Sequence, residues 1–234
     1  MDFCLMLGQS EIPNAFGELA PPMQIAIFLG AMSFATAALV SLTAFTRIII
    51  VLSFVRRALS TQEIPPNQVM LGLAFFLTLF VMAPTIKNIN ERGVKNYLAA
   101  QNATEPEQVF GINELWQVAS DEIRVFMTVH TRPEDLQLFV DLSQMEPTTD
   151  PYAVELKVLI PAFIISELKT AFIMGFCIYI PFLLIDLVIS TVLMSLGMMM
   201  MPPVIVSTPC KLLLFVLVDG WQLISKALVS SFVV

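Results

Sequence analysis

Residues 166–203 read SELKTAFIMGFCIYIPFLLIDLVISTVLMSLGMMMMPP. Between Thr170 and Cys210 the only charged side chain is that of Asp186. A helix needs about 20 mostly apolar residues to cross the hydrocarbon core of a membrane, and this stretch is about twice that long. The stretch therefore predicts a membrane protein with a long apolar helix that ends before the proline pair.

Two further apolar stretches lie earlier in the chain. Met23 to Val55 contains one charged residue, Arg47, and Val69 to Ala83 contains none. Over all 234 residues, 57% are hydrophobic and 13% are charged, whereas soluble domains carry about 25% charged residues. We expect an all-α integral membrane protein with about four long hydrophobic helices in two hairpins and a small helical periplasmic domain between the second and third helices.

Prolines and charges divide the chain into four predicted parts. The first helix is expected to begin at Pro21-Pro22 and to reach Arg56-Arg57, the second is expected to stop at Pro84, and Pro202-Pro203 separate the last two. No Lys or Arg precedes Arg47, so we do not expect a cleaved signal peptide. The parts are a periplasmic N-terminal lead (1–22), a first membrane-type helical hairpin (23–84), an acidic helical periplasmic domain (85–155) and a second membrane-type hairpin with a methionine-rich turn (156–234).

The acidic excess of the chain lies in the middle part. Five basic and twelve acidic residues occur between Thr85 and Glu155, whereas the rest of the chain carries seven of each. Capping-box patterns at Thr104–Glu107 and Thr131–Glu134 predict helix starts there. Arg56 and Arg57 assign their loop to the cytoplasm by the positive-inside rule, which places the middle part on the opposite side of the membrane.

Several charged residues lie within or beside the apolar stretches. Each would cost about 2.5–3.5 kcal/mol at the centre of a membrane helix. Either these side chains snorkel to an interface, or their helices pack against protein or line an aqueous path. We favour a charge network in a multi-subunit assembly. Lys211, Asp219 and Lys226 are expected to share one face of the last helix. The complete set is Arg47, Glu167, Lys169, Asp186, Lys211, Asp219 and Lys226.

The turn before the proline pair is rich in methionine. Methionine is unbranched and adaptable, so a ring of such side chains could seal a pore and still deform around a passing chain. Ordinary core or lipid-facing methionine is the simpler interpretation. The candidate seal residues are Met194, Met198, Met199, Met200 and Met201.

No catalytic residue, cofactor or metal site is predicted. The only histidine is His130, and no cysteine spacing suggests a metal site. Ser166 and Lys169 match the S-x-x-K pattern but lack its companion motifs. A nucleic-acid partner is not expected, because such binding requires a basic face.

Four stretches together resemble the FliP/SctR family of type III export-gate subunits: 43–59, 65–84, 166–203 and 209–221. The resemblance is closer to the flagellar members than to the virulence members. It implies a homo-oligomer, expected to be a pentamer, that forms with FliQ and FliR the pore through which unfolded flagellar proteins cross the inner membrane. It also implies FlhA and FlhB as partners, contact with membrane lipids, a multi-pass location in the cell membrane at the flagellar basal body, and a pore seal at Met198–Met201.

The predicted function is therefore non-enzymatic: a structural and gating subunit of a protein-export channel. A small ion-coupled secondary transporter is the alternative, with Glu167, Lys169 and Asp186 as a relay. A third interpretation is an assembly scaffold that does not contact the pore.

Overall fold

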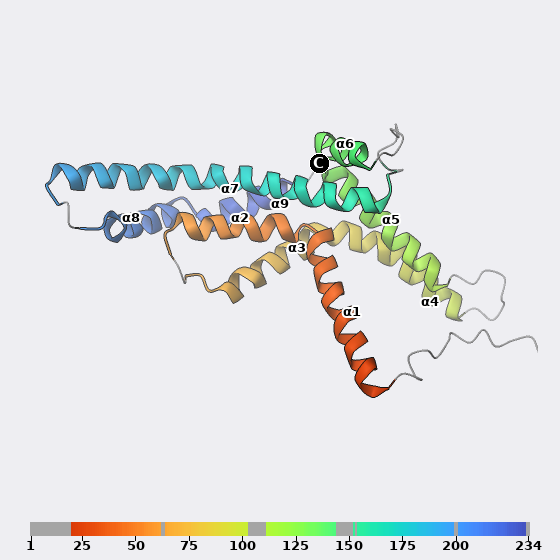
Figure 1. The fold of residues 1–234 in the computed structure, drawn as a ribbon. Coiled ribbons are helices and arrows are strands. Elements are labelled where there is room, and N and C mark those ends of the chain that lie inside the picture. Colours follow the sequence, from red (N-terminus) through yellow and green to blue (C-terminus); the bar gives the residue numbers. More distant parts are fainter. Residues whose placement is uncertain are drawn as a thin grey trace, which may run out of the picture. The chain divides into compact units, whose positions relative to one another are not determined.

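The computed structural model describes residues 20–61, 64–102, 111–143, 152, 154–198 and 201–232. The regular elements in this part of the chain are helices, and no strand occurs among these residues (Figure 1). The all-α class expected from the sequence is therefore confirmed. The chain divides into two compact units, Met1–Leu39 and Val40–Val234.

The first apolar stretch forms two helices instead of the single helix that was expected. Helix α1 spans Pro21–Leu42 and α2 spans Phe45–Ala58. At the break, the Thr46 hydroxyl donates to the Val40 carbonyl at 2.8 Å, and the Phe45 N–H donates to Thr43 Oγ1 at 3.4 Å. Threonine side chains that bond the backbone in this way compete with the helical hydrogen bonds, which explains why the helix ends here.

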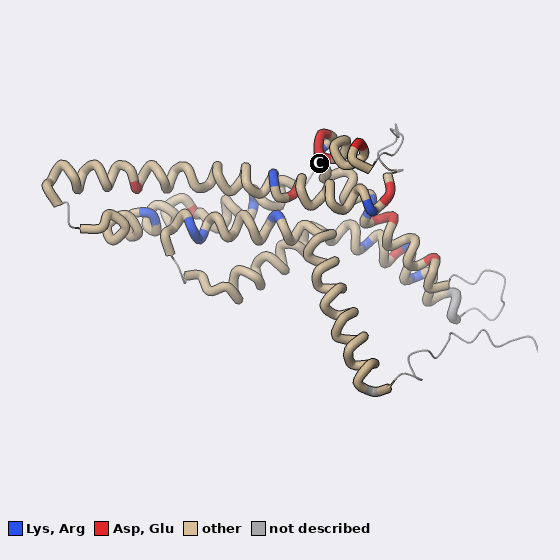
Figure 2. Tube along the Cα trace, viewed as in Figure 1, with Lys and Arg blue, Asp and Glu red and all other residues tan. Residues whose placement is uncertain are grey.

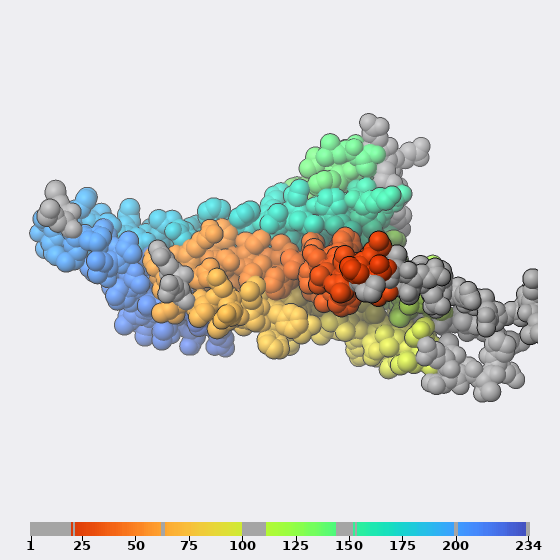
Figure 3. Space-filling view, turned by 60° about the horizontal axis from the view of Figure 1, so that its bottom comes forward, coloured from red at the N-terminus to blue at the C-terminus, as the bar shows by residue number. Residues whose placement is uncertain are grey.

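Helix α2 packs between two longer helices of the second unit. It contacts α7 (Leu156–Ser195) on one side and α3 (Asn67–Ile89) on the other (Figures 1 and 3). Its fully buried side chains include Ile48, Val51, Leu52 and Val55, which recur at the spacing of one helical face. The core of the second unit therefore centres on α2.

Helix α3 does not stop at Pro84, contrary to expectation. It continues through that proline into a π-helical turn, η1 (Asn90–Val94), and then into α4 (Lys95–Asn102). A proline inside a helix removes one hydrogen bond, but in apolar surroundings a helix leaves far fewer polar groups unpaired than an open chain would. The apolar segment Asn67–Ala99 is thus 33 residues long.

Helices α5 (Ile112–His130) and α6 (Pro133–Leu142) carry much of the charge of the described residues. Figure 2 shows that charged residues gather where η1, α5, α6 and the start of α7 lie. The Gly111 N–H donates to Glu114 Oε2 at 2.9 Å and caps α5. The capping box expected at Thr131 is wrong, because the Thr131 hydroxyl donates to the Met127 carbonyl; the one expected at Thr104 lies outside the described residues.

Helix α7 is 40 residues long and passes through both Pro161 and Pro181. It is followed by α8 (Pro203–Leu217) and α9 (Gly220–Ser230), which are bent by 65° relative to each other. Three described helical segments are long and apolar enough to cross a membrane, namely 22–42, 67–99 and 156–195. The bent α8–α9 pair would be a fourth if it counts as one span.

Candidate functional site: two buried ion pairs and a methionine turn

A buried ion pair joins α2 to α7. Arg47 Nε donates to Glu167 Oε2 at 2.7 Å, and Nη2 donates to Glu167 Oε1. Both side chains are buried, with 3% of Arg47 and none of Glu167 exposed. The two parallel hydrogen bonds match the planar fork of the guanidinium to the carboxylate, which is the geometry that makes such pairs strong and directional.

The same arginine also holds the end of α9. Arg47 Nη1 donates to the carbonyl oxygen of Ser231 at 3.0 Å and to its hydroxyl at 3.1 Å. The guanidinium carbon lies 3.8 Å from the centre of the Phe232 ring, a cation–π contact. One guanidinium therefore connects α2, α7 and the segment after α9.

A second ion pair joins α8 to α7. Lys211 Nζ lies 2.6 Å from Asp186 Oδ2 and 2.7 Å from the Ser60 hydroxyl. Lys211 is buried, whereas the Asp186 side chain is about one-third exposed. Ser60 follows α2 with a positive φ of 56°. The lysine thus connects α7, α8 and the loop after α2.

The remaining members of the predicted charge network do not join these pairs. Lys169 Nζ lies 3.5 Å from Glu134 and 3.9 Å from Asp135, in a more exposed cluster between α7 and α6. Exposed pairs of this kind contribute about 0–1 kcal/mol. The predicted network is therefore two separate buried pairs and one surface cluster.

The charged face expected on a single last helix is wrong. Asp219 adopts a left-handed conformation with φ of 51° at the break between α8 and α9. The 65° bend places Lys211 and Lys226 on different helices. Lys226 is exposed, and no ion pair involves it in the part of the chain that the structure describes.

The methionine turn begins with a regular helix stop. Gly197 has a φ of +76°, Met198 N–H donates to Leu193 O at 3.1 Å, and Gly197 N–H donates to Met194 O at 3.1 Å. This is the Schellman arrangement, in which a glycine tolerates the left-handed backbone. Met194, Met198 and Met201 are exposed, whereas Met199 and Met200 lie outside the described residues.

The residues that resembled catalytic groups are engaged with the backbone. Ser166 is fully buried and its hydroxyl accepts a hydrogen bond from the Arg132 N–H at 2.9 Å. The two ring nitrogens of His130 lie 2.7 Å from the Phe126 carbonyl and 3.2 Å from the Phe232 carbonyl. No group of His, Cys, Asp and Glu among the described residues could hold a metal ion.

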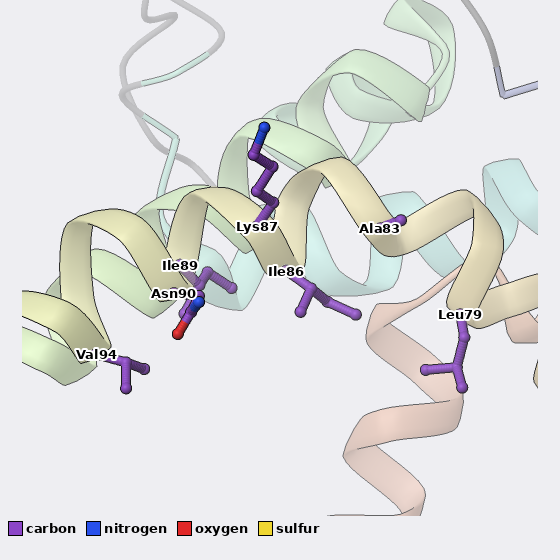
Figure 4. Close-up of a pocket in the computed structure, with 7 residues that line it drawn as sticks. All are labelled: Leu79, Ala83, Ile86, Lys87, Ile89, Asn90 and Val94. Carbon is purple, nitrogen blue, oxygen red and sulfur yellow. The ribbon is translucent and has the colours of Figure 1, made fainter.

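A shallow hollow of about 550 Å³ lies along α3 and η1. Figure 4 shows Leu79, Ile86 and Val94 pointing to one side of this helical segment, while Lys87 points to the other. The hollow does not gather convergent polar groups, which an enzyme site would require.

Sequence reasoning missed Ser60, Ser231 and Phe232 as partners of the buried charges. None of them lies near its partner in the sequence, since Ser231 is 184 residues from Arg47 and Ser60 is 151 residues from Lys211. No local pattern could have identified these contacts.

Comparison with known proteins places the chain in context. Residues 28–228 match the model of the FliP family. The flagellar biosynthetic protein FliP of Bacillus subtilis (strain 168) is 48% identical over 228 residues, which cover 95% of this chain and 100% of that protein. The proteins of the same name from Pectobacterium carotovorum subsp. carotovorum and Aquifex aeolicus (strain VF5) are 46% and 39% identical, and the matches cover 94% and 95% of this chain and 83% and 90% of those proteins.

Proposed function

This chain belongs to the FliP family, and we propose that it is a structural subunit of the flagellar protein-export channel in the bacterial inner membrane. The observation that carries the proposal is the match to flagellar biosynthetic proteins FliP along 94–95% of the chain at 39–48% identity. The match includes both ion pairs and the methionine turn, because all of them lie between residues 28 and 228.

The surface of α7 supports a membrane location. Large apolar side chains such as Phe172, Phe176, Leu183 and Leu187 are about half exposed along this helix. Exposed apolar surface of this extent requires lipid or another protein chain to cover it. The polar helices α4–α6 lie at one end of the apolar segments of the second unit, as Figure 2 shows.

The buried ion pairs explain how charged residues can occur in apolar segments. An unpaired charge would be costly in a membrane, whereas Arg47–Glu167 and Lys211–Asp186 neutralise each other within one chain. Neighbouring subunits are therefore not needed to pair these charges. The case for an assembly depends instead on the exposed apolar surface and on the family.

We place the second unit across the membrane with Arg56 and Arg57 on the cytoplasmic side. This arrangement makes two helical hairpins with the polar helices α4–α6 between them on the periplasmic side. The positive-inside rule supports this orientation, because the two arginines lie in the last turn of α2, just before the next apolar segment.

The methionine turn is proposed as the seal of the channel. The exposed side chains of Met194, Met198 and Met201 are free to contact neighbouring copies around a pore. Flexible thioether side chains can close around irregular shapes and exclude water, so a ring of them would block ions between rounds of export.

Five copies are proposed to assemble with FliQ and FliR, next to FlhA and FlhB, and to pass unfolded flagellar proteins. No observation favours the ion-coupled transporter. Its proposed relay residues are separated, since Glu167 is bound by Arg47, Asp186 by Lys211, and Lys169 lies in the surface cluster with α6.

The experiment that tests this function is deletion and complementation in the bacterium that carries the gene. The deletion strain should neither swim nor release flagellin, and a plasmid copy of the chain should restore both. Native mass spectrometry of the detergent-extracted complex should show several copies bound to other export subunits. Normal flagellin release by the deletion strain would contradict the proposal.

A further inference from the structure

A cavity of about 470 Å³ lies where α7 faces the break between α8 and α9. Ile178 and Phe182 of α7 form one wall, and Leu214, Phe215, Leu223 and Ile224 of the bent pair form the others. The most polar side chain in its lining is the thiol of Cys177. It is therefore an apolar cavity between helices that are proposed to lie in a membrane.

The cavity is a consequence of how the chain bends. The left-handed conformation of Asp219 ends α8, and Gly220 then lies so close to Phe215 that a Cβ atom would meet its ring at 2.3 Å. The Phe215 ring packs edge-on against Trp221, with 5.3 Å between the ring centroids, and its centroid lies 6.3 Å from that of Phe182. These aromatic contacts fix the place of the Phe215 ring in the cavity wall.

Water is a poor occupant of this cavity. A buried water makes about three hydrogen bonds. The lining offers it almost no polar partner. An apolar occupant is favoured, and the volume suits a long hydrocarbon chain better than one protruding side chain.

An exposed cation lies one helical turn beyond the lining of the cavity on α9. Lys226 follows the lining residue Leu223 by one helical turn, and it is exposed without an ion pair among the described residues. Further along the chain, Ser231 binds Arg47. Lys226 therefore lies between the lining residues of α9 and this polar contact in the sequence. A lysine beside an apolar site attracts an anionic headgroup.

We propose that this cavity binds one acyl chain of an anionic phospholipid, whose phosphate contacts Lys226. The two halves of the site match the two halves of such a lipid: an apolar cavity for the tail and an unpaired cation for the headgroup. The inference depends on the membrane location proposed above and does not depend on the export role.

Trp221 can report the occupant, because it packs against Phe215 in the cavity wall. The chain has one other tryptophan, Trp116, and Trp116→Phe leaves Trp221 as the sole tryptophan, which can be excited selectively. The full chain is placed in phosphatidylcholine vesicles that contain a minor fraction of acyl-brominated phosphatidylglycerol or acyl-brominated phosphatidylcholine. Bromine quenches tryptophan on contact, so the proposal expects quenching by both lipids and an apparent affinity about fivefold higher for the anionic one.

Two variants test the headgroup contact and the acyl-chain cavity separately, and each has a matched control. Lys226→Gln should remove the preference for the anionic lipid, whereas Lys157→Gln, at an exposed lysine on the first turn of α7, should keep it. Leu223→Phe fills the cavity and should weaken quenching by both lipids. Leu213→Phe, at an exposed position on α8 outside the lining, should not. Equal affinity for the two lipids, or full quenching in Leu223→Phe, would overturn the proposal.

Native mass spectrometry of the extracted complex tests whether a neighbouring subunit fills the cavity instead. The proposal expects a retained anionic phospholipid that is lost in Lys226→Gln and in Leu223→Phe and kept in both controls. The other outcome is that brominated lipid quenches Trp221 in the isolated chain but the extracted complex retains no lipid. That result would assign the cavity to a protein neighbour and overturn the proposal. Neither readout requires export, so a failed complementation and a failed lipid measurement are distinguishable.

Discussion

Glu167 Oε2 lies 2.7 Å from Arg47 Nε, so one carboxylate joins α2 to α7 across 120 residues of sequence. Both side chains of the pair are buried, and the arginine also binds Ser231. The fold of the apolar part of the chain therefore depends on a polar contact.

Removing one member of this pair should destabilise the protein strongly. Glu167→Gln leaves the buried guanidinium without its counter-ion, which should cost about 3–5 kcal/mol of unfolding free energy. Thermal unfolding of the purified chain in detergent measures the loss. The double variant Arg47→Met with Glu167→Leu should recover most of the stability, because no charge is left buried. Glu134→Gln is the control in the surface cluster and should change stability by at most about 1 kcal/mol. If the double variant lost as much unfolding free energy as Glu167→Gln does, this account would be contradicted.

The second pair should respond asymmetrically to substitution. Asp186→Asn leaves the buried Lys211 with only the Ser60 hydroxyl as a partner, and should cost about 3–5 kcal/mol. Lys211→Met leaves a carboxylate that is about one-third exposed, so the loss should be smaller, about 1–3 kcal/mol. Unfolding in detergent ranks the two variants, and the opposite order would count against the burial argument.

Two glycines in apolar helices should tolerate alanine differently. At Gly220 the new Cβ would meet the Phe215 ring at 2.3 Å, and such overpacking costs about 1–3 kcal/mol. Gly72 of α3 has nothing within 4 Å of its Cβ position, so Gly72→Ala should be neutral or slightly stabilising because alanine favours the helix. The shift of the unfolding midpoint distinguishes them. Equal shifts would mean that the close approach at Phe215 does not constrain the bend.

The methionine seal predicts a change in conductance without a change in assembly. Replacing Met198–Met201 by alanine should leave the complex intact by native mass spectrometry but make cells or vesicles leaky to ions, because shorter side chains leave a gap. Conductance of the reconstituted complex is the measurement. The control replaces the exposed apolar residues Leu183, Leu184, Leu187 and Val188 of α7 by alanine, which should not open a leak. Unchanged conductance in the methionine variant would rule out the seal.

The proposed orientation predicts which positions a membrane-impermeant maleimide reaches from outside. In a chain whose three cysteines are replaced, Trp116→Cys on α5 should be labelled in spheroplasts, because Trp116 is 74% exposed and the proposed orientation puts α5 on the periplasmic side. Arg57→Cys, exposed at the end of α2, should be labelled only after the membrane is permeabilised. The reverse pattern would invert the topology.

The sequence alone predicted the helical class, the apolar segments and the family, because each depends on composition or local pattern. It also singled out the charged residues that form the buried pairs. Its errors were local: a helix expected to run from Pro21 to Arg57, a helix expected to stop at Pro84, and a single last helix. In each case a neighbouring side chain or the apolar surroundings outweighed the simple rule for prolines and apolar runs.

What only the tertiary structure decided is which charges meet. Arg47 finds Glu167 and Ser231, and Lys211 finds Asp186 and Ser60, at separations in sequence of 120, 184, 25 and 151 residues. A local pattern carries no information on such pairs, because they form only when the helices pack together. The sequence therefore determined that this chain holds apolar helices with charges that need partners, and the packing of α2, α7, α8 and α9 decided that the chain supplies those partners itself.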